Sequence, residues 1–362
     1  MMAQSGTRAP LRWRTFLLGG SLGVLVLAAA VLWFGRHGEF AIAWTMPDPV
    51  TIWEGQGVSL DVEGAILRGG SDPDATPVVW ASRPEFSVRV LGASPNRPVR
   101  IANAPGPSAY EPLPEGVTAE SRHWVVTAPG EYRFRLRAND TYSFLVMGDP
   151  QRHPWRLEAA LRLAPDAVFA LCIGDLAEKA TWEEMQRVAE IAEESPLPVY
   201  FTVGNHDVRK GGRRHYRKLF GEENYAFSVG PDRFVVLDTA ASHPYVGDHR
   251  ADLLEQALAL PGTRFRFVFF HVPLFDPRPG PPHALTWGHL RDEILGTLSR
   301  YSVDLAFSGH IHEYLVEERE GVRLVITGGL AATPGVGGGI HVVRVDVAPV
   351  GVSWQVLSVP AS

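Results

Sequence analysis

Residues 142–151 read Tyr-Ser-Phe-Leu-Val-Met-Gly-Asp-Pro-Gln, an apolar run that is closed by a glycine and an aspartate. A short continuous apolar run bounded by turn residues is typical of a strand that is buried on both faces. Glycine lets the backbone turn sharply at the end of such a strand. The stretch therefore predicts a buried strand over 142–147, with Asp149 at its carboxyl end.

The same arrangement recurs along the chain. Apolar runs with the residues that close them are Val168–Ile173 with Gly174-Asp175, Val199–Val203 with Gly204-Asn205-His206-Asp207, Phe265–Phe270 with His271, and Val303–Phe307 with Gly309-His310-Ile311-His312. A further run is Phe234–Leu237, and helical stretches lie at Trp155–Leu163, Trp182–Glu194, Ala251–Leu258 and Leu285–Leu298. Alternating strands and helices predict an α/β fold, in which ligand sites form at the carboxyl ends of the strands. Near the end, Val322–Ile326, Ile340–Val345 and Val352–Leu357 are predicted to form consecutive antiparallel strands.

The residues at these strand ends are of the types that bind metal ions. The candidate ligands are Asp149, Asp175, Asn205, His271, His310 and His312. This set is too large for one ion that keeps a position open for water, so two ions are expected. Mixed carboxylate, amide and imidazole donors favour Mn, Fe or Zn, as divalent or trivalent ions. A pair of ions ~3.5–4 Å apart can clamp the attacking and leaving oxygens of a phosphoryl displacement.

In their order and spacing, these motifs resemble those of the calcineurin-like metallophosphoesterase family over about residues 142–345. The resemblance implies a four-layer sandwich, with two mixed β-sheets flanked by helices and a dinuclear site at the sheet edge. It also implies a role for each ligand: Asp149 and His312 bind the first metal, Asp175 bridges, and Asn205, His271 and His310 hold the second. His206 is similar to the family's catalytic histidine, which stabilises the transition state or protonates the leaving oxygen.

The chain departs from the family pattern at two positions. The family usually has Asp-x-His at the first strand, where this chain has Asp149-Pro150-Gln151. Some branches resemble this chain in having Gln there, so Gln151 is expected to be a weaker ligand of the first metal, with His153 as an alternative. Many members have Asp where this chain has Glu178, and we expect Glu178 to orient His206 in its place.

The implied reaction is hydrolysis of a phosphate ester, either a monoester or a diester, by a hydroxide that bridges the two metals. The chain would then be a phosphatase or a phosphodiesterase, with Asn205, His206 and Arg152 contacting the substrate. Residues 209–218 form a basic run, which is predicted to be a solvated loop, with capture of a phosphate or an anionic lipid headgroup as the alternative. The alternative function is a non-catalytic, metal-stabilised binding or scaffold protein of the cell envelope with a degenerate site, and Gln151 is the residue that supports it.

Residues 39–140 differ in character from the rest. Short β-prone runs with period-two alternation are separated by Pro, Gly and Asn, which predicts a small β-sandwich-like accessory domain. The region has no cluster of candidate ligands. We therefore expect a β-rich accessory domain over 39–140 and the phosphoesterase domain over 142–362.

The N-terminal region predicts export. Residues 16–34 are uncharged and long enough to cross a ~30 Å hydrocarbon core. Arg8, Arg12 and Arg14 precede this run and Arg36 follows it, which predicts a cytoplasmic segment 1–15, a transmembrane helix or signal anchor 16–35, and a single-pass membrane protein. The catalytic domain would lie on the extracytoplasmic side, periplasmic or extracellular. A signal peptide cleaved near 28–30 is the alternative.

Composition narrows the functional classes further. The chain has 362 residues and a formal net charge of −6, which gives no basic field for nucleic acid. Its single cysteine, Cys172, lies within an apolar run and excludes a cysteine-based metal site.

Overall fold

The computed structural model describes residues 53–55, 58–68, 76–104, 113–120, 123–136, 140–240, 249–333 and 338–360. All of them belong to one compact unit, Met46–Pro244 with Asp248–Ser362. The predicted segments 1–15 and 16–35 lie outside the described residues. Within the described ranges, no helix has both the length and the apolar character that a membrane span requires.

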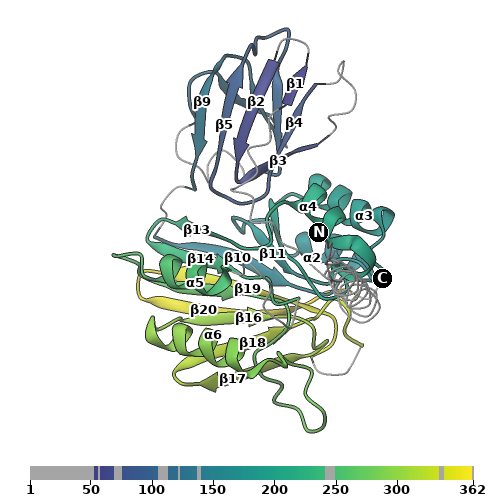
Figure 1. Ribbon diagram of the computed structural model, residues 1–362, viewed down its shortest axis with the longest axis vertical. Helices are drawn as coiled ribbons and strands as arrows, with labels where there is room; N and C mark the ends of the chain where they lie inside the picture. The colour runs from purple at the N-terminus through teal and green to yellow at the C-terminus, as the bar shows by residue number, and fades with distance from the viewer. Residues whose placement is uncertain are drawn as a thin grey trace, which may run out of the picture. The chain divides into compact units, whose positions relative to one another are not determined.

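Two mixed sheets form the part of the chain after residue 140 (Figure 1). The first has the order β12-β11-β10-β19-β20, with bounds Val199–Thr202, Ala170–Ile173, Tyr142–Met147, His341–Ala348 and Gly351–Ser358. The second has the order β13-β14-β15-β16-β18-β17, with bounds Tyr225–Val229, Asp232–Val236, Arg266–Phe269, Leu305–Ser308, Val322–Thr327 and Tyr314–Arg319. β10, β11 and β12 are parallel in one sheet, as are β14, β15, β16 and β18 in the other. The predicted α/β class with mixed sheets is confirmed.

Helices cover the outer faces of these sheets. The helices are α2 (Pro154–Leu161), α3 (Trp182–Glu194), α4 (Gly212–Phe220), α5 (Arg250–Leu258) and α6 (Gly288–Arg300). Apolar residues of α2, α3 and α4 share a core with the first sheet, and those of α5 and α6 share another with the second. α3 begins with a reciprocal capping box between Thr181 and Glu184, which satisfies donors at its N-terminus.

Aromatic side chains fill the space between the two sheets. The ring of Phe144 from β10 meets the ring of Phe234 from β14 edge-on, with centroids 5.3 Å apart, and Phe267 in the same manner at 5.4 Å. These phenylalanines are fully buried. Because the aromatic layer joins both sheets, it fixes the strand ends of one sheet relative to those of the other.

The predicted pairing of the last strands is wrong in one respect. β18 lies in the second sheet, parallel to β16 and antiparallel to β17, whereas β19 and β20 pair with each other in the first sheet. Gly328 and Gly329 follow β18, and a Cβ on either would come within 3 Å of another residue. The chain thus crosses between the sheets at a point where only glycines fit, which apolar patterning alone does not reveal.

The predicted basic loop over 209–218 is also wrong. It forms a short 3-10 turn, Arg209–Gly211, and then helix α4. Tyr216, Leu219 and Phe220 recur at helical spacing and are buried against α3 and the first sheet. Cationic residues occupy the other face of the helix, so the charge run concealed the amphipathic pattern.

The described part of the chain before residue 140 forms two sheets whose strands are mostly antiparallel. One has the order β1-β2-β5-β9, with bounds Trp53–Gly55, Val58–Glu63, Phe86–Leu91 and Gly130–Phe134. The other has the order β3-β4-β6-β8-β7, with bounds Ala65–Arg68, Val78–Ala81, Val99–Ala102, His123–Val126 and Val117–Ala119. Their inner faces share one apolar core, in which the rings of Trp124 and Phe134 lie 5.0 Å apart. The domain boundary near residue 141 stays a prediction.

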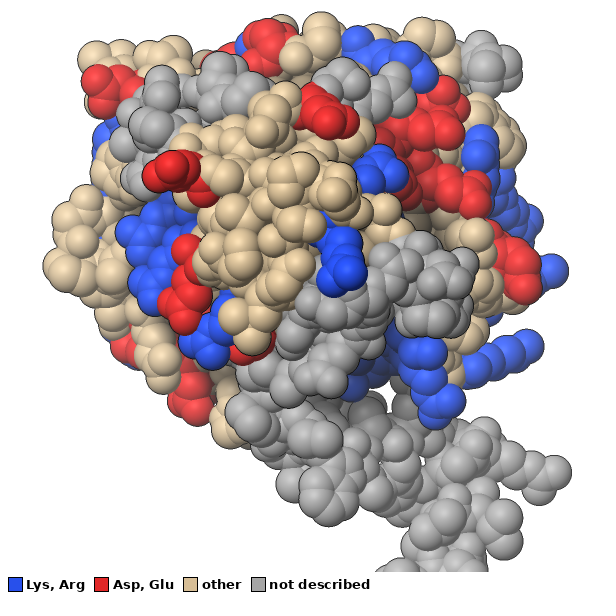
Figure 2. All heavy atoms as spheres, turned by 90° about the horizontal axis from the view of Figure 1, so that it is seen from above, with Lys and Arg blue, Asp and Glu red and all other residues tan. Residues whose placement is uncertain are grey.

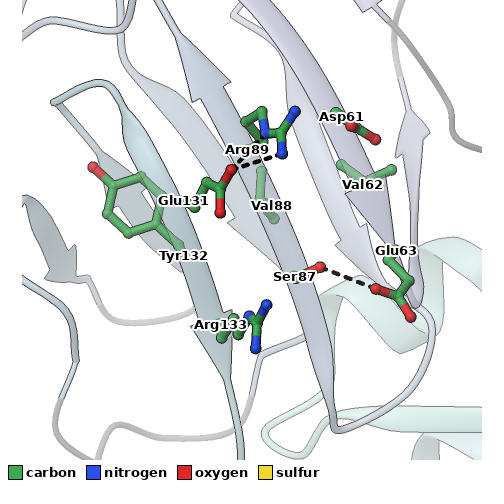
Figure 3. Close-up of a pocket in the computed structure, with 9 residues that line it drawn as sticks. All are labelled: Asp61, Val62, Glu63, Ser87, Val88, Arg89, Glu131, Tyr132 and Arg133. Carbon is green, nitrogen blue, oxygen red and sulfur yellow. Dashed lines mark hydrogen bonds and ion pairs between the residues drawn. The ribbon is translucent and has the colours of Figure 1, made fainter.

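The outer face of the first of these sheets is polar. Figure 3 shows a shallow hollow there, in which Arg89 of β5 binds Glu131 of β9 and Ser87 donates to Glu63. Acidic and basic residues alternate across the hollow, as expected of a solvated sheet face. Over the wider molecular face in Figure 2, blue and red side chains are likewise interspersed, and neither sign covers it.

The aromatic layer generates a stability prediction. Replacing Phe234 by Ala removes a fully buried ring that contacts both sheets, so the free energy of unfolding should fall by about 3–5 kcal/mol. Urea denaturation followed by circular dichroism measures this. Leu91→Ala is the matched control, because Leu91 is 55% exposed, and should change stability by less than ~0.5 kcal/mol. Equal effects of the two substitutions would contradict the proposed role of the layer.

Candidate metal centre

The predicted site residues lie at the carboxyl ends of the parallel strands of both sheets. Asp149 follows β10, Asp175 follows β11 and Asn205 follows β12, while His271 follows β15 and the His310–His312 segment follows β16. Several of these residues have left-handed backbone: Asp149 at φ 62, Asp175 at φ 51 and His310 at φ 66. Non-glycine residues seldom adopt this conformation, and it is concentrated where side chains must turn towards a common point.

Asp175, His271 and His310 form the centre of the group. Each offers one ligand atom, and these atoms all lie within 4.8 Å of one another. Nδ1 of His271 lies 2.9 Å from the carbonyl oxygen of Ile173, to which it donates. Nε2 therefore faces inward, 3.0 Å from Asn205 Oδ1 and 3.2 Å from Asp175 Oδ1. Electron-rich atoms from three strand ends thus converge on one point, and a cation stabilises that arrangement.

Asp149 lies beside this group and is fully buried. Both of its carboxylate oxygens accept from the backbone N–H of His310 at 3.1 Å, and Oδ1 lies 3.4 Å from His312 Nε2. A Cβ at Gly309 would come 2.5 Å from Asp149 Oδ2, and one at Gly328 would come 2.8 Å from it. The backbone therefore approaches the carboxylate so closely that only glycine fits at these two positions.

The structure also brings Gln151 to Asp175. Its amide nitrogen donates to Asp175 Oδ2 at 3.0 Å. An amide ligates a metal through its oxygen, so Gln151 would bind an ion only with the amide turned over. His153, the alternative ligand, stacks edge-on against Trp155; burial and two neighbouring arginines lower the pKa of His153.

His206 lies at the edge of the group, on the side of Glu178. Its backbone N–H donates to Asp175 Oδ1 at 2.8 Å, and its Nε2 lies 3.9 Å from Asp175 Oδ2. Its Nδ1 lies 2.9 Å from the carbonyl oxygen of Glu178 and 3.7 Å from the carboxylate of the same residue. The backbone of Glu178 is thus closer to the ring than the side chain that the sequence suggested. The Glu178 carboxylate binds Arg152, whose side chain is 71% exposed.

Charge is balanced across the buried groups. Burial lowers the pKa of His271, but the carboxylates of Asp175 and Asp149 outweigh that effect and raise it to about 10. Burial raises the pKa of Asp175, and His271 and His206 together hold it below its usual range. Burial and the charge of His271 lower the pKa of His310 to about 4. The carboxylates thus favour a positive charge beside them, which a protonated His271 or a bound cation would supply, and these donors fit Mn, Fe or Zn.

Sequence reasoning missed two residues near the site. Asp207 is fully buried and accepts from the backbone N–H groups of Gly204 and Ala177, which ties together the turns after β12 and β11. Burial and the charge of Asp175 raise the pKa of Asp207 to about 7. Its position as the last residue of Gly-Asn-His-Asp was the available signal.

The second missed residue is His283, whose ring centroid lies 6.3 Å from that of His310. Its backbone N–H donates to Asp276, and the Asp276 carboxylate also binds Arg278. Arg278 in turn binds Glu313, next to His312. A proline-rich loop between β15 and α6 is thus held over the site, and no periodic pattern in the sequence pointed to it.

Comparison with known proteins agrees with this geometry. Residues 142–314 match the family model described as calcineurin-like phosphoesterase. Residues 142–314 thus form a calcineurin-like phosphoesterase domain. The predicted resemblance is confirmed, and the chain is placed among the metallophosphoesterases.

The curated relatives of this calcineurin-like phosphoesterase are phosphatases. Serine/threonine-protein phosphatase CPPED1 of Rattus norvegicus is 22% identical over 201 residues, which cover 49% of this chain and 64% of the relative. The Danio rerio protein of the same name is 24% identical over 213 residues, which cover 53% and 68%. The chain thus spans slightly less than two thirds of the rat protein. A solved purple acid phosphatase, PPD1 from yellow lupin seeds, covers 75% of this chain and 57% of its own at 13% identity, with a TM-score of 0.49.

The close approach at Gly309 generates a prediction. In Gly309→Ala the new methyl group would meet Asp149 Oδ2 at 2.5 Å and His271 Nδ1 at 3.2 Å, so one ligand must move. Metal affinity should fall by at least about tenfold, measured by competition with a chromogenic chelator.

Gly296→Ala is the matched control, because a Cβ there meets nothing within 4 Å on helix α6. It should leave metal affinity unchanged and raise the free energy of unfolding by up to ~1 kcal/mol. Unchanged metal affinity in Gly309→Ala would show that metal binding does not depend on the close approach of the Gly309 backbone to the Asp149 carboxylate.

Proposed function

We propose that the chain hydrolyses phosphate esters, monoesters or diesters, at a centre of two metal ions. The observation that carries the proposal is the convergence of Asp175, His271 and His310, with the fully buried Asp149 adjacent to them. Asp149 and His312 would hold the first ion, with Gln151 as a weaker ligand. Asp175 would bridge, and Asn205, His271 and His310 would hold the second. Bound ions would supply Lewis acidity and lower the pKa of water.

Access to the site supports a reaction there. Asp149 and Asp175 are buried, whereas the side chains of His312 and His206 are 39% and 19% exposed. The ligand group is therefore open on the side of the histidines, where a phosphate ester can enter. Carboxylates that were wholly enclosed would support structural metal binding instead.

His206 is the residue placed to act on the substrate. Its Nδ1 donates to the Glu178 carbonyl, so Nε2 points towards the Asp175 carboxylate at the edge of the ligand group. A donor in that position can hydrogen-bond a phosphoryl oxygen or pass a proton to the departing ester oxygen. Asn205 contributes an amide on the same side. Both residues lie in one turn, and the Asp207 carboxylate stabilises that turn by accepting from the backbone N–H of Gly204.

The bridging role of Asp175 is testable. Asp175→Asn keeps the shape of the side chain but removes its charge, so bound metal and activity should both fall by at least about a hundredfold. Metal analysis, together with rates on p-nitrophenyl phosphate and bis-p-nitrophenyl phosphate with Mn(II), measures both. Asp252→Asn is the control, because Asp252 is 73% exposed on α5. If Asp175→Asn retained both metals and the full rate, the assignment would be wrong.

The same substrates test the alternative of a non-catalytic scaffold. That function predicts no turnover of either ester under any of the three metals, with the wild-type protein folded. The buried carboxylates and histidines at the strand ends support the enzyme instead, because a degenerate site has no need of buried carboxylates that face a common point.

We also propose, from the sequence, that residues 16–35 anchor the protein in a membrane with the phosphoesterase domain outside the cytoplasm. The apolar run and the arginines before it support this. Deleting residues 1–38 should move the protein from the membrane fraction to the soluble fraction on ultracentrifugation. The deletion should leave metal content unchanged. Membrane association that survived the deletion would contradict the anchor.

A further inference from the structure

Two arginines flank the side of the site where His206 lies. Arg152 Nη2 binds Glu178 Oε1 at 2.7 Å, and Arg209 Nη1 lies 3.0 Å from His206 Nδ1. That nitrogen already donates to the Glu178 carbonyl, so the Arg209 guanidinium gains no acceptor from the ring. Arg152 follows β10 and Arg209 follows β12, so the two guanidiniums reach Glu178 and His206 from different strand ends.

The positive charge near His206 comes from Arg152 and Arg209, and the carboxylates of Glu178 and Asp175 balance it. The hydrogen bond from Arg152, together with the charges of both arginines, holds the pKa of Glu178 below its usual value. Beyond them, Lys210, Arg214 and Lys218 are exposed and have no acidic partner among the described residues. Residues 208–221 contain no Asp or Glu.

The other two cations of helix α4 are already compensated. Arg213 binds Glu223 and the buried Asp238, and Arg217 binds Glu223. Arg213 and Arg217 thus have acidic partners, as Arg152 has in Glu178. Arg209, Lys210, Arg214 and Lys218 are exposed and form no ion pair among the described residues, so they are open to solvent or to a ligand. A charge run that served only solubility would not single out this side of the catalytic histidine.

From this arrangement we infer that the site prefers phosphate esters whose leaving group carries a second anionic group, a carboxylate or a further phosphate. The inference rests on the proposed function, in which His206 faces the leaving oxygen. A leaving group on that side extends towards Arg209, and a guanidinium binds carboxylate and phosphate through paired N–H groups. The metal ligands determine which bond is hydrolysed, whereas Arg209 and Arg152 determine which leaving groups are bound tightly.

The test uses two pairs of compounds that differ by one carboxylate. Phenylphosphonate and 4-carboxyphenylphosphonate are not hydrolysed, so calorimetry on the full chain with Mn(II) gives their Kd values directly. Phenyl phosphate and 4-carboxyphenyl phosphate give kcat and KM. The wild type should bind the carboxylated phosphonate about tenfold more tightly, as one charge-assisted contact allows, and the preference should weaken as salt rises.

Arg209→Met should remove most of that preference, and KM for the carboxylated ester should rise. Arg209→Lys should keep part of the preference. Arg162→Met is the matched control, because Arg162 lies just after the last turn of α2 and pairs with Glu158; it should keep the full preference. A role of Arg209 that is confined to orienting His206 would instead lower kcat equally for both esters.

The outcomes separate the two proposals. If wild type and Arg209→Met showed the same Kd ratio while phenyl phosphate was hydrolysed, the inference would be overturned and the proposed function would stand. If the wild type hydrolysed neither ester with Mn, Fe or Zn, the proposed function would fail, and the inference with it.

Discussion

Burial of two carboxylates at the edge of the sheets is the constraint on which the rest of the site depends. Asp149 and Asp175 are almost completely removed from water, and an ion in such a place costs several kcal/mol unless it is compensated. Backbone N–H groups of His310 and His206 each donate to one of them. Hydrogen bonds from neutral donors reduce the cost but leave the negative charge. A cation is needed among the carboxylates, and imidazole nitrogens and amide oxygens surround the place where it would lie.

The core of the two-sheet domain serves this constraint. The candidate ligands come from strands of both sheets, so their mutual distances depend on how the sheets are held. The aromatic layer sets that relation through edge-to-face contacts of Phe144 of β10 with Phe234 of β14 and Phe267 of β15. Helices on the outer faces then let the strands be apolar on both sides. The polar residues are consequently confined to the strand ends, where they gather in one place.

Much of this could be predicted from the sequence because the signal is local and repeated. Four of the buried strands are followed by a glycine and then an acid, an amide or a histidine, and β15 is followed by His271. Parallel strands bring such ends together whatever their order in the sheet. Strand order was harder, since β18 and β19 are adjacent in sequence but belong to different sheets. Their separation depends on the packing of Gly328 and Gly329 against other elements. Helix α4 was missed because cations on one face outnumbered the apolar residues that bury the other.

Residues that act through a second residue were the least predictable. Asp207 supports the site by holding two turns, and His283 reaches it from a loop with no periodic pattern. The contribution of each depends on tertiary contacts made by residues far apart in the chain. A side chain that could ligate a metal, by contrast, can be predicted from its residue type and its place at a strand end. Sequence reasoning therefore proposes the candidate ligands more readily than the residues that orient them.

The left-handed residues show why the orientation is nonetheless secure. Asp149, Gln151, Asp175 and His310 all have positive φ, a conformation that costs about 1–2 kcal/mol for a residue with a side chain. Such residues persist only where the surrounding structure over-determines them. Here the strands before them are buried, and the backbone groups beside them are paired, as Asp149 N is with the carbonyl of Gly174. The stability of the sheets thus holds the candidate ligands in these strained conformations, with their side chains directed to a common point before any ion binds.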